Sequence, residues 1–263
     1  MLHLLKRIGA ILLALVLIAS FAACAQSPTT VDPEALAFES YSQILQQMSV
    51  SPGQSGAFDI DFIMVMDMIF EDDTMHSVST GNMTAVVDGD TMRTSMVMET
   101  DMGALGSMLL EIYMAVEGTT VTAMYMAIDG EEFPTDFLTP ELLDEMLENA
   151  VNMPDVDEEA FLSVEMEEID GNTVLHIVLD GQMLMDFALA TMGDALGDLG
   201  FEMDLTIGDM PMTIVLDSDG SPLSMTMDMT MEMVIDGEEM ISHSVSTFTF
   251  NAFGDGVEIV SFV

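Results

Sequence analysis

The sequence predicts an α+β protein whose main part is an antiparallel sheet of about ten strands, accompanied by helices. Three observations lead to this prediction. Apolar and polar residues alternate over 57–71 and again over 223–235, which is the two-residue period of strands with one buried face. Asp-Gly pairs recur between the alternating segments, and such pairs favour tight hairpins. Apolar residues at spacings of three and four in other segments indicate helices.

Residues 1–23 have the pattern of a secretory signal peptide, in which Lys6 and Arg7 precede a short apolar run and then small residues. Cys24, the sole cysteine, follows directly, and its setting resembles a bacterial lipoprotein signal, in which the cysteine is lipidated. An ordinary signal peptide followed by a cysteine is the alternative. We expect an exported lipoprotein held by a lipid anchor on the extracytoplasmic face of the cell membrane, with 24–31 as a tether.

The first ordered element is predicted to be a helix over 33–48. Asp32 suits the N-cap position and Pro33 the first helical position. A stretch rich in Ser, Pro and Gly then ends the helix, and the period becomes two. The predicted strands cover 57–71, 76–87, 91–99, 108–117, 120–128, 162–169, 173–180, 201–207, 210–217, 222–235 and 239–253.

Two further helices are expected to interrupt the strands. One begins at Pro140, and the other covers about 181–199, where Met185 and Met192 belong to an apolar stripe. Glycines weaken the second helix, which makes it a candidate lid. Because no domain-sized linker divides 32–263, we expect a single domain.

The charge of the chain excludes one class of partner. There are 47 acidic residues against three basic ones, a formal net charge of −44. Nucleic acid is excluded because phosphate binding needs clustered Lys and Arg, and docking on anionic lipid headgroups is disfavoured. Half of the residues are apolar, so the chain can bury a core and need not be disordered. Self-repulsion keeps such molecules apart, so we expect a monomer.

Three features together resemble the LolA-like lipoprotein superfamily, nearest to Gram-positive lipoproteins of the LppX and LprG type. They are the exported N-terminus, a helix leading into long strands, and the amino-acid pattern of the segments 223–233, 248–253 and 257–260. The resemblance implies a strongly curved antiparallel sheet, a half-barrel, with helices covering its concave face over a hydrophobic cavity. Members of the superfamily carry acyl chains or lipidated molecules there, and the resemblance supplies no catalytic residues. The sequence departs from those carriers in its acidity and in placing Met at most Leu and Phe positions.

Thirty methionines are the outstanding feature of the composition. They fit an ordinary core, and they equally fit a cavity for flexible apolar chains, because Met is unbranched and polarizable. A third interpretation is binding of copper(I) or silver(I), which thioethers prefer as soft ligands. Against that interpretation, the stripe of Met64, Met66 and Met68 continues into Phe58 and Phe62, which bind no metal.

We interpret the apolar strand faces as the wall of a cavity for a hydrophobic small molecule or lipid, such as an acyl chain. A filled core would show the same stripes, and a structural or partner-binding lipoprotein without a small ligand is a further alternative. An apolar outer face would favour that alternative, and Ile63, Val65 and Ile69 hint at one. The predicted lining residues are Phe62, Met64, Met66, Met68, Met225, Met227, Met229 and Met231, with Met185 and Met192 from the covering helix.

Other residues give no sign of catalysis, a cofactor or a dedicated metal site. His76, His176 and His243 lie in predicted strands, where a histidine is more often a satisfied strand residue than a ligand or a base. Nucleophile-elbow, zinc-protease and phosphate-loop motifs are absent from the sequence. The many carboxylates do not follow the spacing of a calcium loop and are expected to be solvated.

Overall fold

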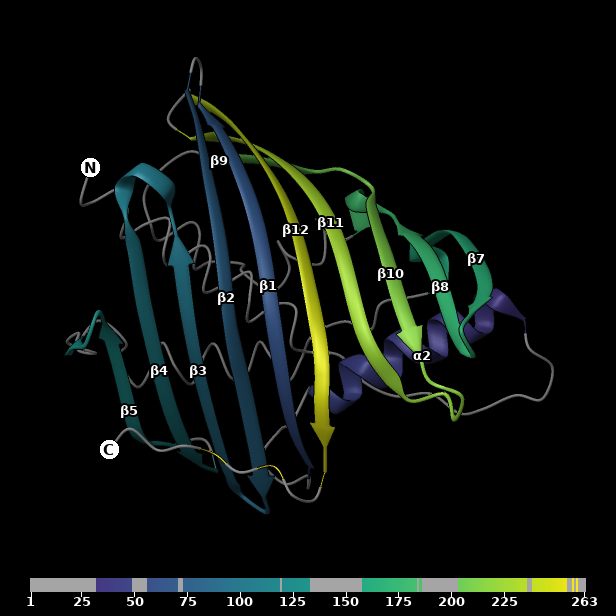
Figure 1. Ribbon diagram of the computed structural model, residues 1–263, viewed down its shortest axis with the longest axis horizontal. Helices are drawn as coiled ribbons and strands as arrows, with labels where there is room; N and C mark the ends of the chain where they lie inside the picture. Colours follow the sequence, from purple (N-terminus) through teal and green to yellow (C-terminus); the bar gives the residue numbers. More distant parts are fainter. Residues whose placement is uncertain are drawn as a thin grey trace.

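The computed structural model is dominated by one antiparallel sheet, and, in the part of the chain that the structure describes, one long helix packs against it (Figure 1). The structure describes residues 32–48, 56–70, 73–118, 120–132, 158–183, 185, 203–235, 238–254, 257 and 259. Among these residues, the helical elements with bounds at both ends are α2 (Pro33–Met48) and the short 3-10 turns η1 (Gly103–Leu105) and η2 (Glu158–Ala160).

The sheet has twelve strands, and all eleven segments predicted from the alternation are strands within a few residues of their predicted bounds. The additional strand is a pair of exposed glutamates, too short to show a period. The strands are β1 (Gly56–Phe70), β2 (Asp73–Asp88), β3 (Thr91–Asp101), β4 (Ser107–Glu117), β5 (Thr120–Ile128), β6 (Glu131–Glu132), β7 (Phe161–Ile169), β8 (Asn172–Leu179), β9 (Met203–Ile207), β10 (Met210–Leu216), β11 (Pro222–Ile235) and β12 (Glu238–Phe253).

The first and last strands of the chain lie side by side in the middle of the sheet (Figure 1). The strand order is β6-β5-β4-β3-β2-β1-β12-β11-β10-β8-β7, and every pair is antiparallel. Each half is therefore a meander that runs outward from the β1–β12 pair. The path of the sheet ends at β6 on one side and at β7 on the other, so the sheet is open.

Strands β9 and β10 both pair with β11, one after the other along its length. Ile207 pairs with Met231 and Met212 pairs with Met227, so the segment from 207 to 212 has one more residue than the segment of β11 opposite it. The extra residue falls at the break between β9 and β10, where the Gly208 amide donates to the Thr230 carbonyl at 2.9 Å. An insertion of this kind is a β-bulge, which bends a strand and strengthens its twist.

The two faces of the sheet differ as the alternation predicts. On β1, Phe58, Ile60 and Phe62 are buried on the face that we call the inner face, whereas Asp61 and Ile63 are exposed on the outer face. The ladders with the neighbouring strands extend this division across the sheet. The core of the protein therefore lies on the inner face.

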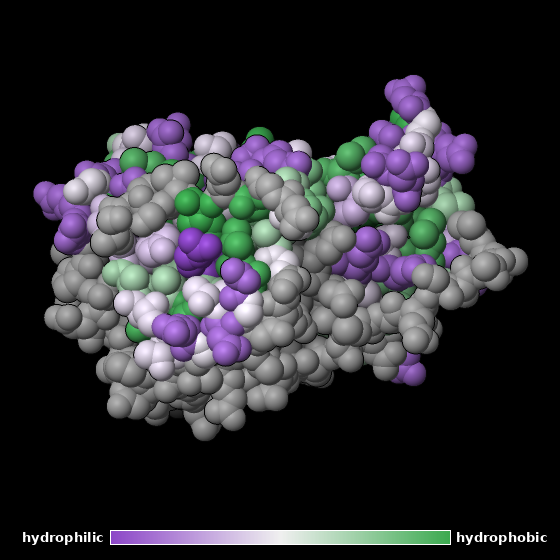
Figure 2. Space-filling model, turned by 90° about the horizontal axis from the view of Figure 1, so that it is seen from below, coloured by the Kyte–Doolittle hydropathy of each residue, from purple (hydrophilic) through white to green (hydrophobic). Residues whose placement is uncertain are grey.

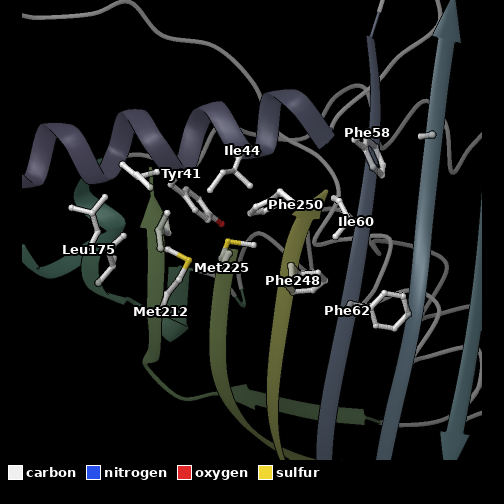
Figure 3. Packing of buried hydrophobic residues seen from close by; sticks show 14 of the residues in the cluster. Tyr41, Ile44, Phe58, Ile60, Phe62, Leu175, Met212, Met225, Phe248 and Phe250 are labelled. Carbon is white, nitrogen blue, oxygen red and sulfur yellow. The ribbon is translucent and has the colours of Figure 1, made fainter. Parts of the chain in front are cut away.

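Helix α2 packs on the inner face near β7, β8 and β10, and it also contacts β1. Its Ala37, Tyr41 and Ile44 are buried in the main core cluster, and Figure 3 shows Tyr41 and Ile44 pointing from the helix toward the strands. The predicted N-cap is confirmed, because Asp32 Oδ1 accepts a hydrogen bond from the Glu34 amide at 3.2 Å.

Two Asp-Gly pairs adopt the hairpin geometry that the sequence predicts. Asp129 and Gly130 have φ of 54° and 77°, and Asp170 and Gly171 have φ of 53° and 85°. Positive φ at both central residues is the signature of a type I′ turn. These turns close the β5–β6 and β7–β8 hairpins.

Helical cover of the whole concave face stays a prediction, because only α2 is described over its full length. Residues 181–183 and 185 are helical, as predicted for the start of the second covering helix. The rest of that helix, the helix expected at 140–150, the signal peptide and the tether lie outside the described residues. None of the helices in the described part is long and apolar enough to cross a membrane.

Candidate functional site

The inner face of the central strands carries an ordered alternation of thioethers and hydroxyls. Three serines of β12 lie between three methionines of β1 on one side and three methionines of β11 on the other. We call these the Met–Ser–Met rows. They are Met64–Ser246–Met227, Met66–Ser244–Met229 and Met68–Ser242–Met231.

All eight predicted lining residues from the strands belong to the inner face, but they fall into two packing groups. Phe62 and Met225 are buried in the main core cluster, which also includes residues of α2, and Met227 and Met229 pack against that cluster. The remaining four belong to a second cluster. Of the two residues predicted from the covering helix, Met185 is half-buried in its helical turn, and Met192 lies outside the described residues.

The second cluster consists of methionine alone among the described residues. We call it the methionine cluster, and sequence reasoning assigned only part of it to the site. Its buried members are Met66, Met68, Met231, Met233 and Met240, with Met64 and Met75 packed against them. Met233 and Met240 are directly opposite each other on β11 and β12, and Met68 and Met75 are opposite on β1 and β2.

The serines were also missed, and they are the most informative polar groups on the inner face. Ser242 and Ser244 are each 5% exposed, and Ser77 of β2, opposite Met66, is 6% exposed. Within the described ranges, none of these hydroxyls has a hydrogen-bonding partner. The repeated Ser at alternate positions of 242–246 was visible in the sequence. Its meaning depends on the register with distant strands, which no local pattern supplies.

Elsewhere in the same sheet, buried hydroxyls are paired. Ser79 and Thr100 are 2.9 Å apart across β2 and β3, and Thr84 and Ser95 are 2.6 Å apart. A buried hydroxyl without a partner costs about 1–3 kcal/mol. The hydroxyls of the serines between the thioethers are therefore available to hydrogen-bond a ligand or water.

An aromatic side chain lies at the boundary between the two clusters. Phe62 of β1 is opposite Gly81 of β2, and a Cβ built at Gly81 would lie 2.6 Å from the ring carbon Cζ. The ring therefore occupies the space that a side chain at position 81 would need. This arrangement fixes Phe62 beside the Met–Ser–Met rows and explains the glycine in the middle of a strand.

The three histidines of the described chain lie on the outer face, away from the thioethers. Each pairs with a carboxylate of a neighbouring strand: His76 with Asp67 at 2.7 Å, His176 with Glu167 at 2.9 Å, and His243 with Asp228 at 2.7 Å. Their side chains are 43–60% exposed. The prediction that these are satisfied strand residues agrees with this geometry.

Other outer-face groups give no site of their own. A hydrogen bond from Asn82 at 3.0 Å, together with Asn251, lowers the pKa of Asp61 below its usual range. Ile63 and Ile69, two of the three residues that hinted at an apolar outer face, are 51% and 41% exposed, and Val65 between them is half-buried. In the part of the chain that the structure describes, no group of three or more His, Cys, Asp or Glu could hold a metal ion.

Seen from below, the described surface is mostly hydrophilic at its rim, with a few small hydrophobic patches between (Figure 2). This agrees with a chain whose acidic residues face solvent.

Comparisons with known proteins assign no family. No protein-family model and no curated protein matches the chain, so the LolA-like resemblance stays a prediction. One similar solved structure is lipovitellin, from a study of its lipid–protein interactions, at 7% identity and a TM-score of 0.34. The match covers 80% of this chain and 26% of that one, so this chain spans about a quarter of lipovitellin.

Two similar structures are closer to this chain in size. A β-barrel-like protein of the domain of unknown function DUF1849, from Brucella abortus, is 11% identical, with a TM-score of 0.25 over 77% of this chain and 100% of that one. A DUF1329 family protein from Desulfovibrio piger is 10% identical, with a TM-score of 0.25 over 88% and 96%. With TM-scores of 0.34 and below, none of these structures assigns a ligand to this chain.

Proposed function

We propose that this protein binds or carries a hydrophobic ligand, an acyl chain or lipid, on the inner face of the sheet without catalysing a reaction. The observation that carries the proposal is the set of buried serine hydroxyls without described partners, which lie between thioethers in the Met–Ser–Met rows. An apolar chain with hydrogen-bonding groups, such as the esters of a lipid, satisfies both kinds of surface.

The methionines suit such a ligand for a physical reason. A Met side chain has three rotatable bonds and a polarizable sulfur, so a wall of methionines adapts to chains of different length and shape. The serines of β12 are smaller than the methionines on either side of them, so side-chain volume is lowest along the middle of the rows. Ligand sites in proteins are commonly of this composition, a mainly apolar wall with a few placed polar groups.

The test is native mass spectrometry of residues 25–263 purified without detergent, followed by organic extraction. We expect lipid at a defined stoichiometry. Met66→Glu or Met229→Glu should reduce it in a protein that circular dichroism shows to be folded, because a carboxylate in the Met–Ser–Met rows disfavours contact with an apolar chain. A matched control is Ile63→Glu on the outer face of β1, which should leave the lipid unchanged.

A bare polypeptide mass that gains nothing when lipid is added would contradict the proposal. The methionines would then be filled core, and the exposed outer-face residues Ile63 and Ile69 would become the place to look for a protein partner. Equal loss of lipid in Met66→Glu and Ile63→Glu would also contradict it, because lipid would then adhere without using the inner face.

We further propose that the protein is exported and lipid-anchored through Cys24. The support is the sequence pattern of the first 24 residues. The mass of the mature protein tests this proposal, since cleavage before Cys24 and acylation each change it by a defined amount. In Cys24→Ser, we expect the protein to leave the membrane fraction, and retention there would contradict the anchor.

A further inference from the structure

The methionine cluster is separate from the main core cluster, which contains the buried aromatic residues. The start of β12, which contributes Met240, lies at the top of the sheet in Figure 1, whereas α2 lies at the lower right. Phe58, Ile60 and Phe62, which precede Met64 on the same face of β1, belong to the main core cluster. The objection that these three side chains cannot bind metal therefore does not apply to the methionine cluster.

Three thioethers surround one small residue within this cluster. Ser242 of β12 is directly opposite Met68 of β1 and Met231 of β11. Met240 precedes Ser242 by two residues and so points to the same face. Met68 and Met231 are two strand spacings apart, about 10 Å between their Cα atoms. Side chains of three rotatable bonds on a curved inner face can converge across that gap above Ser242.

The three methionines are themselves deeply buried, with 4% exposure for Met68 and for Met231 and 8% for Met240. A cation bound there would lose water on every side, so thioether coordination must replace it. Met233, opposite Met240, and Met75, opposite Met68, provide two more sulfurs at the edge of the same group.

The charges of the chain favour a monovalent cation at this place. Thioethers are neutral, so a bound ion keeps its charge. Asp67 lies between Met66 and Met68 in the sequence, and Glu232 lies between Met231 and Met233, so both carboxylates are on the outer face of the strands that carry the cluster. The net charge of −44 adds a field that attracts cations to the whole molecule.

We propose that Met68, Met231 and Met240 form a binding site for a soft monovalent cation, copper(I) or silver(I), above Ser242. Soft ions of this class select thioether ligands. Hard cations such as calcium and magnesium take oxygen ligands instead, and they are excluded from a site of three sulfurs. The site needs no histidine, which agrees with the position of His76 and His243 on the outer face.

The test uses the protein with Cys24→Ser, which removes the only thiol, and silver(I) as the probe. Equilibrium dialysis measures stoichiometry and affinity, and copper(I) is measured by competition with a coloured chelator. The variant carries Met68→Leu, Met231→Leu and Met240→Leu together. Leucine keeps the volume and apolar character of the core but cannot bind the ion.

The matched control carries Met92→Leu, Met96→Leu and Met98→Leu, three buried methionines of β3 in the main core cluster. We expect one silver(I) per chain, an affinity lower by about 100-fold or more in the first variant, and a change of less than about threefold in the control. Absence of stoichiometric binding by the unsubstituted protein would overturn the proposal. So would equal losses in the two variants, which would mean that scattered thioethers bind silver.

A second measurement decides the matter if the triple variant does not fold. In the unsubstituted protein, the methyl signals of methionine are followed by carbon-13 NMR during addition of silver(I), and single Met→Leu variants assign them. We expect the signals of Met68, Met231 and Met240 to move together and to stop at one equivalent. Shifts spread equally over the methionines of β3 would overturn the proposal.

Discussion

The close approach of Phe62 to Gly81 allows a prediction with a worked magnitude. In Gly81→Ala, the new Cβ would lie 2.3 Å from the Val97 carbonyl oxygen and 2.6 Å from Phe62 Cζ. Both distances are about 1 Å short of ordinary van der Waals contact. Overpacking of this kind costs about 1–3 kcal/mol, and the lower entropy of alanine in the unfolded chain returns less than about 1 kcal/mol. We expect a net destabilisation of about 1–2 kcal/mol.

A double-mutant cycle separates the ring from the backbone in that cost. Phe62→Leu removes the ring but leaves the Val97 carbonyl, so Gly81→Ala should cost less by about 1 kcal/mol in the Phe62→Leu background. Urea unfolding followed by circular dichroism measures all four proteins. Gly208→Ala is the control, because the nearest atom to its Cβ would be the Thr230 carbonyl oxygen at 3.6 Å. Additive effects, or a Gly81→Ala protein as stable as the control, would refute the packing described for Phe62.

Three further predictions concern other parts of the molecule. Gly181→Ala should destabilise the junction between its helical turn and β9, because the new Cβ would lie 2.3 Å from the carbonyl oxygens of Ile207 and Gly208; a melting temperature equal to that of Gly208→Ala would contradict this. Burial raises the pKa of Tyr41 to about 12. The unfolded chain loses that proton first, near pH 10, so stability is unaffected at lower pH and falls by about 2 kcal/mol by pH 12. Tyr41→Phe should remove this alkaline fall in urea unfolding, and an unchanged slope would refute the assignment. Finally, salt or divalent cations should raise the melting temperature by screening a net charge of −44; a flat or falling value by calorimetry would count against self-repulsion.

The strands were predictable because polar and apolar residues alternate along them, most clearly in strands such as β1 and β10, where exposed or half-buried residues alternate with buried ones. Alternation over β1 or β11 is a local signal that needs no knowledge of the partner strand. The N-terminus of α2 was predictable for a similar reason, since Asp32 and Pro33 act within the first helical turn. Strand β6, two exposed glutamates, offers no period and was missed.

Pairing between distant strands could not be derived from those local signals. Nothing in β1 or in β12 specifies that the first and last strands meet, yet that pairing places Ser242, Ser244 and Ser246 between two lines of methionines. The division of the thioether stripe into two clusters has the same origin. Residues along one strand look continuous in sequence, whereas their neighbours on adjacent strands decide which cluster they join.

The proposed lipid and the proposed soft cation make different demands on the same side chains, and this difference separates them. A lipid needs apolar volume, so Met→Leu in the Met–Ser–Met rows should leave lipid binding intact, whereas Met→Glu should abolish it. A soft cation needs sulfur, so Met→Leu alone should abolish it. A filled core needs neither ligand, and there Met→Glu should lower stability without any ligand to lose. Met→Leu and Met→Glu at Met68 and Met231 therefore distinguish a lipid site, a soft-cation site and a filled core. Met→Leu removes the sulfur but keeps an apolar side chain, whereas Met→Glu places a charge in the buried row.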